Sequence, residues 1–209
     1  ARQIALTVPA KARTASTTKK SAPPLTLRES AAGWDIAGAN GTFTIDRLHG
    51  QVAGWQVNGH ELLVGAPRLS FWRAPTDNDG ITHAPEGRIL KEWRHFRFNQ
   101  MQERVDGVEC TALADGGAKL NVVTRVAPPI WDLGWACAYD WTFMPDGSAT
   151  VTVSGTPSGK FPEAIPRIGL VCELPDAITR ATWFGRGPGE NYDDSREAAP
   201  VGRYGMTVD

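Results

Sequence analysis

Carboxylate side chains gather in two short stretches of this chain, each with an arginine, a proline and aromatic residues. Residues 71–79 read Phe-Trp-Arg-Ala-Pro-Thr-Asp-Asn-Asp, and residues 183–192 read Trp-Phe-Gly-Arg-Gly-Pro-Gly-Glu-Asn-Tyr. Two carboxyl groups about 5–5.5 Å apart, or somewhat farther, can cleave a glycosidic bond, one as acid and the other as nucleophile or base. The carboxylates in or beside these stretches are Asp77, Asp79, Glu190, Asp193 and Asp194.

The run Asp77-Asn78-Asp79-Gly80 has two interpretations. In the simpler one it is a turn, in which Asp and Asn side chains accept hydrogen bonds from nearby backbone amides and Gly80 permits the chain reversal. In the other, the residues from Gly80 to Glu86 form a loop with little packing potential that serves a ligand. The residues alone leave both interpretations open.

The run Glu190-Asn191-Tyr192 also has two interpretations. In a structural network, Glu190 pairs with Arg73 or Arg186 and Tyr192 inserts its ring, since a buried carboxylate without such a partner is costly. The alternative is direct contact with a substrate. We favour the structural network.

Short runs rich in β-branched residues recur from Leu25 onward and predict the strands that position these stretches. Examples are residues 42–45, 119–124 and 150–153. Residue pairs that suit hairpin turns separate the runs. These pairs are Asn40-Gly41, His49-Gly50, Asn58-Gly59, Asp106-Gly107 and Asp146-Gly147. The pattern predicts an all-β chain with antiparallel sheets that bury one face.

One short helix is predicted from Pro85 to about Phe96. Proline suits the first position of a helix. Ile89, Leu90 and Trp93 fall at helical spacing, so we expect them to share one buried face.

Tryptophans and cysteines have different expected places. Most of the eight tryptophans are expected in the core, whereas Trp72 and Trp131 lie beside loop prolines and are candidates for a sugar-facing surface.

The three cysteines, Cys110, Cys137 and Cys172, occur in apolar β-like runs and are expected to be buried, reduced thiols.

The strings Arg-Ala-Pro-x-Asp-Asn-Asp and Gly-x-Gly-Pro-x-Glu-Asn-Tyr, in this order, resemble motifs of the C-terminal, small-chain region of large β-galactosidases of glycoside hydrolase family 2. Residues 166–170 are similar to that family too, so the resemblance covers about residues 41–204. It implies an antiparallel β-sandwich of the galactose-mutarotase-like super-sandwich type, truncated in this chain.

The resemblance implies no catalytic residue in this chain, because the family's catalytic glutamates lie on a separate (β/α)₈ barrel. Such a barrel needs about 250 residues. The resemblance also implies a loop at the rim of the substrate site, with candidate residues Gly80, Ile81, Thr82, His83 and Glu86. The chain departs from family members that carry a residue between the last Asp of the motif and the Gly. The motif residues expected to be structural are Arg73, Asp77, Asn78, Asp79, Arg186, Glu190, Asn191 and Tyr192.

Three segments follow along the chain. Residues 1–8 are expected to be the last strand of a preceding immunoglobulin-like domain, and residues 9–24 a linker rich in Pro, Ala, Ser, Thr and Lys. Residues 25–209 are expected to form the super-sandwich domain, incomplete at its C-terminus. Because the sequence begins with Ala1 rather than Met, we expect a fragment or a processed product.

The net charge and the spacing of residues limit the kinds of partner that we expect for this chain. Residues 1–24 hold five basic residues and no acidic one, so residues 25–209 carry 17 basic against 23 acidic residues, a net charge of −6. Such a domain would repel phosphate backbones, which argues against nucleic acid. No apolar run approaches the roughly 20 residues of a membrane span. The four histidines show no metal-ligand spacing, so no metal site is expected here.

The resemblance implies further expectations for the parent enzyme. Its Mg²⁺ and Na⁺ are expected on other domains, and its partners are the catalytic barrel, the remaining domains and a galactoside. We expect a homo-oligomer at full length and a cytoplasmic location, the latter consistent with reduced thiols.

Three functions compete. The favoured one is a non-catalytic terminal domain of a β-galactosidase that buttresses the barrel and lends a loop to the active-site rim. The second is a stand-alone carbohydrate-binding module, which would bind sugar as an isolated chain. The third is an aldose-epimerase-like enzyme, which would need a general acid and base, typically His with Glu.

Overall fold

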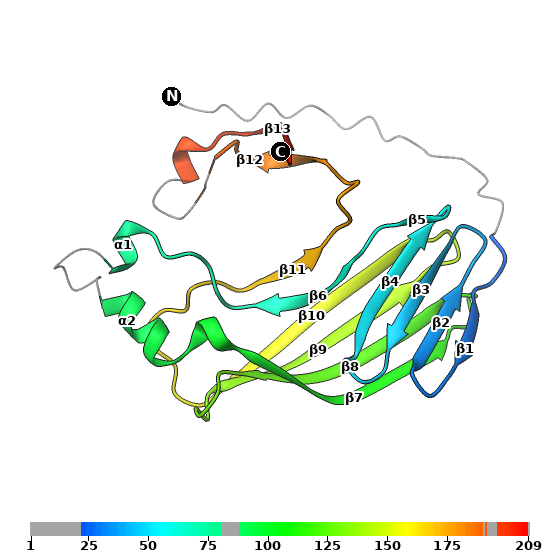
Figure 1. The fold of residues 1–209 in the computed structure, drawn as a ribbon, viewed down its shortest axis with the longest axis horizontal. Helices are drawn as coiled ribbons and strands as arrows, with labels where there is room; N and C mark the ends of the chain where they lie inside the picture. Colours follow the sequence, from blue (N-terminus) through cyan, green and yellow to red (C-terminus); the bar gives the residue numbers. More distant parts are fainter. Residues whose placement is uncertain (1–21, 81–87, 190, 192–195, 209) are drawn as a thin grey trace. The chain divides into compact units, whose positions relative to one another are not determined.

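The computed structural model describes residues 22–80, 88–189, 191 and 196–208. Antiparallel strands dominate these residues (Figure 1). The described residues divide into two compact units, a first one within residues 22–174 and a second one within residues 175–208. The expected all-β fold is confirmed. The expected strand at residues 1–8 and the linker up to residue 21 lie outside the described residues.

Two antiparallel sheets build most of the first unit. One has five strands in the order β1-β2-β3-β4-β5: Thr26–Glu29, Gly33–Ala37, Gly41–Asp46, Gln51–Val57 and His60–Glu61. The other has four longer strands in the order β10-β9-β8-β7. In chain order, these run from β7 to β10 at Gln102–Ala112, Ala118–Ala127, Gly134–Phe143 and Ala149–Ser158.

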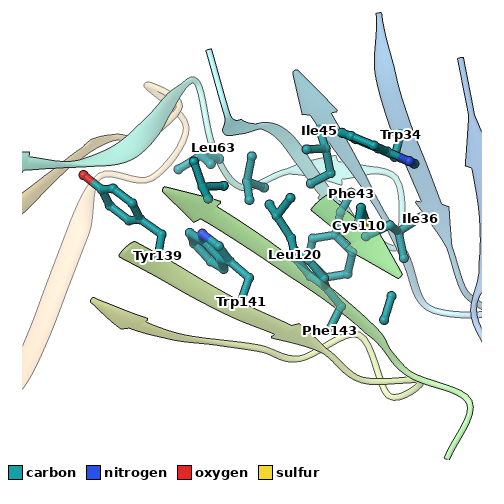
Figure 2. Packing of buried hydrophobic residues seen from close by; sticks show 13 residues of the cluster. Trp34, Ile36, Phe43, Ile45, Leu63, Cys110, Leu120, Tyr139, Trp141 and Phe143 are labelled. Atoms are coloured by element: carbon teal, nitrogen blue, oxygen red, sulfur yellow. The ribbon is translucent and has the colours of Figure 1, made fainter. Parts of the chain in front are cut away.

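The main core lies between these two sheets, because the strands alternate as the sequence predicts. In β8, Leu120 and Val122 are fully buried, whereas Lys119 and Val123 on either side of this pair are exposed and Asn121 between them is half-buried. Figure 2 shows side chains of both sheets meeting: Phe43 of β3 lies against Phe143 of β9, with ring centroids 4.6 Å apart. Burying one such side chain contributes about 1.5–3 kcal/mol, so this contact layer is what joins the sheets into a sandwich.

A second core carries the segments that lead to the first motif. Strand β6 (Gly65–Ser70) pairs antiparallel with β11 (Gly169–Glu173). Beyond β6 come the single helical turn α1 (Asp77–Gly80), the helix α2 (Arg88–His95) and the 3₁₀ turn η2 (Phe98–Gln100). The buried aromatic residues of this core are Phe71, Trp93, Phe98 and Trp135. They connect α2 and the end of β6 to the four-stranded sheet.

The predicted helix is confirmed over the residues that the structure describes. Ile89, Leu90 and Trp93 all pack into the second core, so they share the expected face. The predicted start, residues 85–87, lies outside the described residues. Helix α2 ends at His95, and Arg97 then takes a left-handed conformation with φ 57°.

The second unit is a hairpin. Strand β12 (Arg180–Arg186) pairs antiparallel with β13 (Val201–Thr207), and the 3₁₀ turn η3 (Arg196–Ala198) lies between them in the chain. Trp183 and Tyr204 face each other across the hairpin, with ring centroids 5.7 Å apart.

Most of the predicted turns are confirmed, and one is wrong. Gly50, Gly59 and Gly147 take positive φ between paired strands, as hairpin turns require. Asp106-Gly107 instead lies inside β7, where the pairing with β8 shifts register at a bulge. An Asp-Gly pair suits a bulge as well as a turn, because in both the chain contains a residue that does not take part in the regular hydrogen-bond pairing between strands.

The cysteine prediction is partly wrong. Cys110 and Cys137 are buried and free, and burial raises the pKa of each thiol to about 11. Cys172 is free but exposed. It lies in β11, which among the described residues pairs only with β6 and leaves residues 170–173 exposed on both faces.

None of the helices in the described parts of the chain is long and apolar enough to cross a membrane.

Candidate functional site around Arg73 and Asp79

The first motif leaves the sheet at a firmly anchored point. Strand β6 ends at Ser70, and the next residue, Phe71, is buried against Trp135 with ring centroids 4.1 Å apart. Residues 71–76 then run without regular structure to α1. Pro75 cannot donate a backbone hydrogen bond, and side-chain hydrogen bonds of Arg73 and Thr76 connect this run to α1.

Arg73 and Asp79 form a two-pronged ion pair. Arg73 Nη1 donates to Asp79 Oδ2 at 2.6 Å and Nη2 donates to Asp79 Oδ1 at 2.9 Å. The two side chains are only 17% and 10% exposed. Planar guanidinium and carboxylate groups match in this geometry, and the pair is stronger than a single contact.

Thr76 completes the coordination of Asp79. Its backbone N–H and its hydroxyl both donate to Asp79 Oδ2, at 2.7 and 3.0 Å. The hydrogen bond from Arg73 lowers the pKa of the Asp79 carboxyl, and the contacts from Thr76 act in the same direction against the effect of burial. Asp79 is therefore held ionised as the acceptor of a hydrogen-bonded cluster.

Arg73 also connects three segments of the chain. Its Nε donates to the carbonyl of Pro166 at 3.1 Å, and its guanidinium carbon lies 4.9 Å from the ring centroid of Trp93 on α2. Trp93 in turn donates from Nε1 to the carbonyl of Ala164 at 2.9 Å. The first motif, α2 and residues 164–166 are thus fixed to one another by partly buried polar contacts.

Gly80 has a different role from the one expected. Its φ lies outside the left-handed region, so it supplies no unusual backbone angle. A Cβ atom built on Gly80 would instead lie 2.6 Å from Leu90 Cδ2 and 3.1 Å from Leu90 Cβ. Gly80 suits this position because α1 and α2 approach closely, as Figure 1 also shows.

Many of the predicted site residues lie outside the described residues: Ile81, Thr82, His83, Glu86, Glu190, Tyr192, Asp193 and Asp194. For Asp77 and Asn78, the structure describes only the backbone, within α1. Asn191 is exposed. The hypothesis that Glu190 pairs with Arg73 or Arg186 stays a prediction.

Arg186 has local partners in the second unit. Its Nη1 donates to the backbone carbonyls of Arg196 and Ala199, the latter at 3.1 Å. Its Nη2 lies 3.8 Å from a carboxylate oxygen of Glu197. These contacts tie the end of β12 to η3.

The two candidate sugar-facing tryptophans differ. Trp131 donates from Nε1 to the carbonyl of His95 at 3.1 Å and packs on Phe96, so it covers the end of α2. Trp72 is half-buried, its ring is nearly perpendicular to that of Trp93 with centroids 6.3 Å apart, and it lines a cavity beside β6.

The residue patterns alone did not identify Asp79 as the partner of Arg73. A signal for half of the cluster was present: Thr76 and Asp79 have the spacing of a capping box, in which a carboxylate reaches back to the backbone N–H three residues earlier. In the described ranges, no group of three or more His, Cys, Asp or Glu residues could hold a metal ion.

Comparison with known proteins identifies relatives of the chain. Residues 37–209 match the family model described as the β-galactosidase small chain. The chain is 31% identical to a β-galactosidase of Priestia megaterium over 96% of its own length, and 29% identical to one of Kluyveromyces lactis over 78%. It spans 18% and 16% of the lengths of these relatives. A β-galactosidase of Pectobacterium atrosepticum is 28% identical over 99% of the chain, which spans 20% of it.

Proposed function

The chain belongs to the β-galactosidase small-chain family, and on that premise we propose that it forms a non-catalytic C-terminal domain of a β-galactosidase acting on terminal β-D-galactosides. The all-β fold supports this proposal, since a catalytic (β/α)₈ barrel of about 250 residues would need alternating strands and helices. The chemistry would then take place on another part of the enzyme.

The observation that carries the proposal is the cluster of Arg73, Thr76 and Asp79. It anchors α1 at the upstream end of the segment Gly80–Glu86, and the packing of Trp93 anchors α2 at the downstream end. A loop held at both ends can close over a sugar and exclude water without supplying catalytic groups. The domain would thereby contribute to the rim of the galactoside site.

The wider role follows from the same premise. The domain would buttress the barrel and contribute to a homo-oligomer, and any Mg²⁺ or Na⁺ of the enzyme would be bound by other domains. A cytoplasmic location is supported by the three free cysteines.

Two assays test the proposal. The isolated chain should neither hydrolyse a nitrophenyl β-D-galactoside nor interconvert galactose anomers. In the intact enzyme, Asp79→Asn should change kcat and KM together at temperatures where the variant stays folded, because it loosens the anchor of the loop. The matched control is Asp106→Asn, which removes an exposed ion pair with Arg104.

Hydrolysis or mutarotation by the isolated chain would overturn the non-catalytic role. Unchanged kinetics of the folded Asp79→Asn enzyme would remove the loop from the mechanism.

A further inference from the structure

A cavity of about 510 Å³ lies in the first unit, between β6 on one side and η2 with the start of β7 on the other. This volume is within the range of about 300–1,000 Å³ that is usual for small-molecule sites. Its lining contains one tryptophan, Trp72, and the hydrogen-bonding side chains of Gln51, Arg68, Ser70, Asn99, Gln102 and Glu103. The site described above does not use these side chains.

The polar side chains of the cavity are available to a ligand. Among the described residues, Arg68, Asn99 and Gln102 are exposed and form no side-chain hydrogen bond or ion pair. Arg68 offers up to five N–H donors, and each amide offers both a donor and an acceptor. Donors and acceptors in such a mixture complement hydroxyl groups, which need both.

The pairing of β7 with β8 and the hydroxyl of Tyr139 position Glu103. Glu103 lies opposite the buried Val126, on the same face of the sheet, and its side chain interacts with the hydroxyl of Tyr139. That hydroxyl accepts a hydrogen bond from the backbone N–H of Leu69 at 3.0 Å. Burial raises the pKa of Tyr139, so its O–H stays protonated and can donate to Glu103. A carboxylate has two acceptor oxygens, so Glu103 can accept from Tyr139 and from a ligand together.

The charges of the cavity favour a neutral ligand. Arg68 and Glu103 contribute one positive and one negative charge, and they line the same cavity without forming an ion pair. A phosphate or sulfate would gain from Arg68 but would be repelled by Glu103. A neutral polyol can instead donate to Glu103 and accept from Arg68 at the same time.

Trp72 adds an apolar wall to this polar set. It lines the cavity and is half-buried. The electron-rich face of an indole attracts the weakly positive C–H groups on one side of a pyranose ring. A cavity lined by an aromatic ring and by a mixed set of donors and acceptors therefore suits a sugar better than a purely polar or purely apolar ligand.

We propose that the cavity between β6 and β7 is a binding site for a neutral hexopyranose, alone or as the end of a short saccharide. Arg68 and Glu103 bind its hydroxyl groups, and Trp72 contacts its C–H face. This inference does not depend on the proposed role of the domain in hydrolysis, because the whole cavity lies within residues 51–171.

The test is a titration of the 209-residue chain with galactose, lactose and inorganic phosphate, monitored by calorimetry and by chemical shifts of the tryptophan indole N–H groups. Saturable binding of galactose or lactose is expected. Arg68→Ala and Glu103→Gln should each weaken it about tenfold or more, since each removes a charge-assisted hydrogen bond. The matched control is Arg28→Ala, which removes an exposed arginine on β1, outside the cavity.

The outcomes separate clearly. Sugar binding that both cavity variants weaken and Arg28→Ala leaves unchanged supports the proposal, provided circular dichroism shows that the variants are folded. The proposal is overturned by sugar binding that survives both cavity variants, by the absence of saturable sugar binding, or by tighter binding of phosphate than of sugar at Arg68.

Discussion

The carboxylate of Asp79 accepts hydrogen bonds from two residues that precede it by three and six positions, Thr76 and Arg73. Both partners of the ion pair are largely buried. Removing one of them should therefore lower the free energy of unfolding more than breaking a surface ion pair does. The same carboxylate accepts a hydrogen bond from the backbone N–H of Thr76, so it stabilises the local backbone conformation as well as the ion pair.

Asp79→Asn should lower the free energy of unfolding by roughly 3 kcal/mol, because it replaces the carboxylate with an amide whose N–H₂ group faces guanidinium donors. Urea denaturation of the 209-residue chain at neutral pH measures this change. Asp106→Asn, at an exposed ion pair, is the control and should change stability little. Equal effects of the two variants would contradict a structural ion pair at Asp79.

The lowered pKa of Asp79 also predicts a pH dependence. In the unfolded chain an Asp titrates near pH 3.9, so the stabilisation is complete above about pH 5 and is lost as the pH falls below about 4 through the folded-state value. The free energy of unfolding of the unmodified chain should therefore fall more between pH 5 and pH 3 than that of Asp79→Asn. Parallel decreases in the two proteins would show that Asp79 does not contribute to this pH dependence.

The elements α1 and α2 approach each other where one of them has no side chain. Gly80 of α1 lies against Leu90 of α2. The contact joins the element before residues 81–87 to the element after them. Any side chain at position 80 must displace Leu90, which belongs to the second core. Close packing of two short elements thus favours glycine here, even though its backbone angles are ordinary.

Gly80→Ala should destabilise the chain by about 1 kcal/mol or more, because the gain in helix propensity is smaller than the cost of moving Leu90. In a Leu90→Ala background the same substitution should cost less, and a double-mutant cycle measures the difference. Gly107→Ala is the control, since a Cβ atom there would meet nothing within 4 Å. An additive cycle would rule out the contact as the reason for the glycine.

The whole molecule combines a strand-rich first unit with a small C-terminal hairpin and an N-terminal stretch of low apolar content. The long strands β7 to β10 share one core with the five-stranded sheet, so their backbone hydrogen bonds open only when that core opens. Residues 9–24 contain no aromatic or large aliphatic residue that could join a core.

Hydrogen exchange should therefore be slowest in the central strands β8 and β9 and fast throughout residues 9–24. Mass spectrometry of peptides after brief exposure to D₂O measures both. Within the hairpin β12–β13, whose residues are mostly exposed, we expect intermediate protection. Strong protection across residues 16–20 would contradict the linker assignment.

Local patterns in the sequence were sufficient for the elements. Alternation in residues 119–124, glycines at positions 59 and 147, and the spacing of Ile89, Leu90 and Trp93 predicted strands, turns and a helix face that the structure confirms. Two long motifs also indicated the family. These signals are short-range, because a strand or a turn depends mainly on residues within a few positions of it.

Contacts between distant segments were decided only by the tertiary structure. The carbonyl of Pro166 at Arg73, the bulge at Asp106-Gly107, the exposure of Cys172 and the contact of Gly80 with Leu90 all depend on what another segment places beside the residue. A charged or small side chain is compatible with several partners at the level of sequence. Which partner it has depends on how the sheets pack, since the cost of an unpaired buried group or a steric clash arises only once the segments meet.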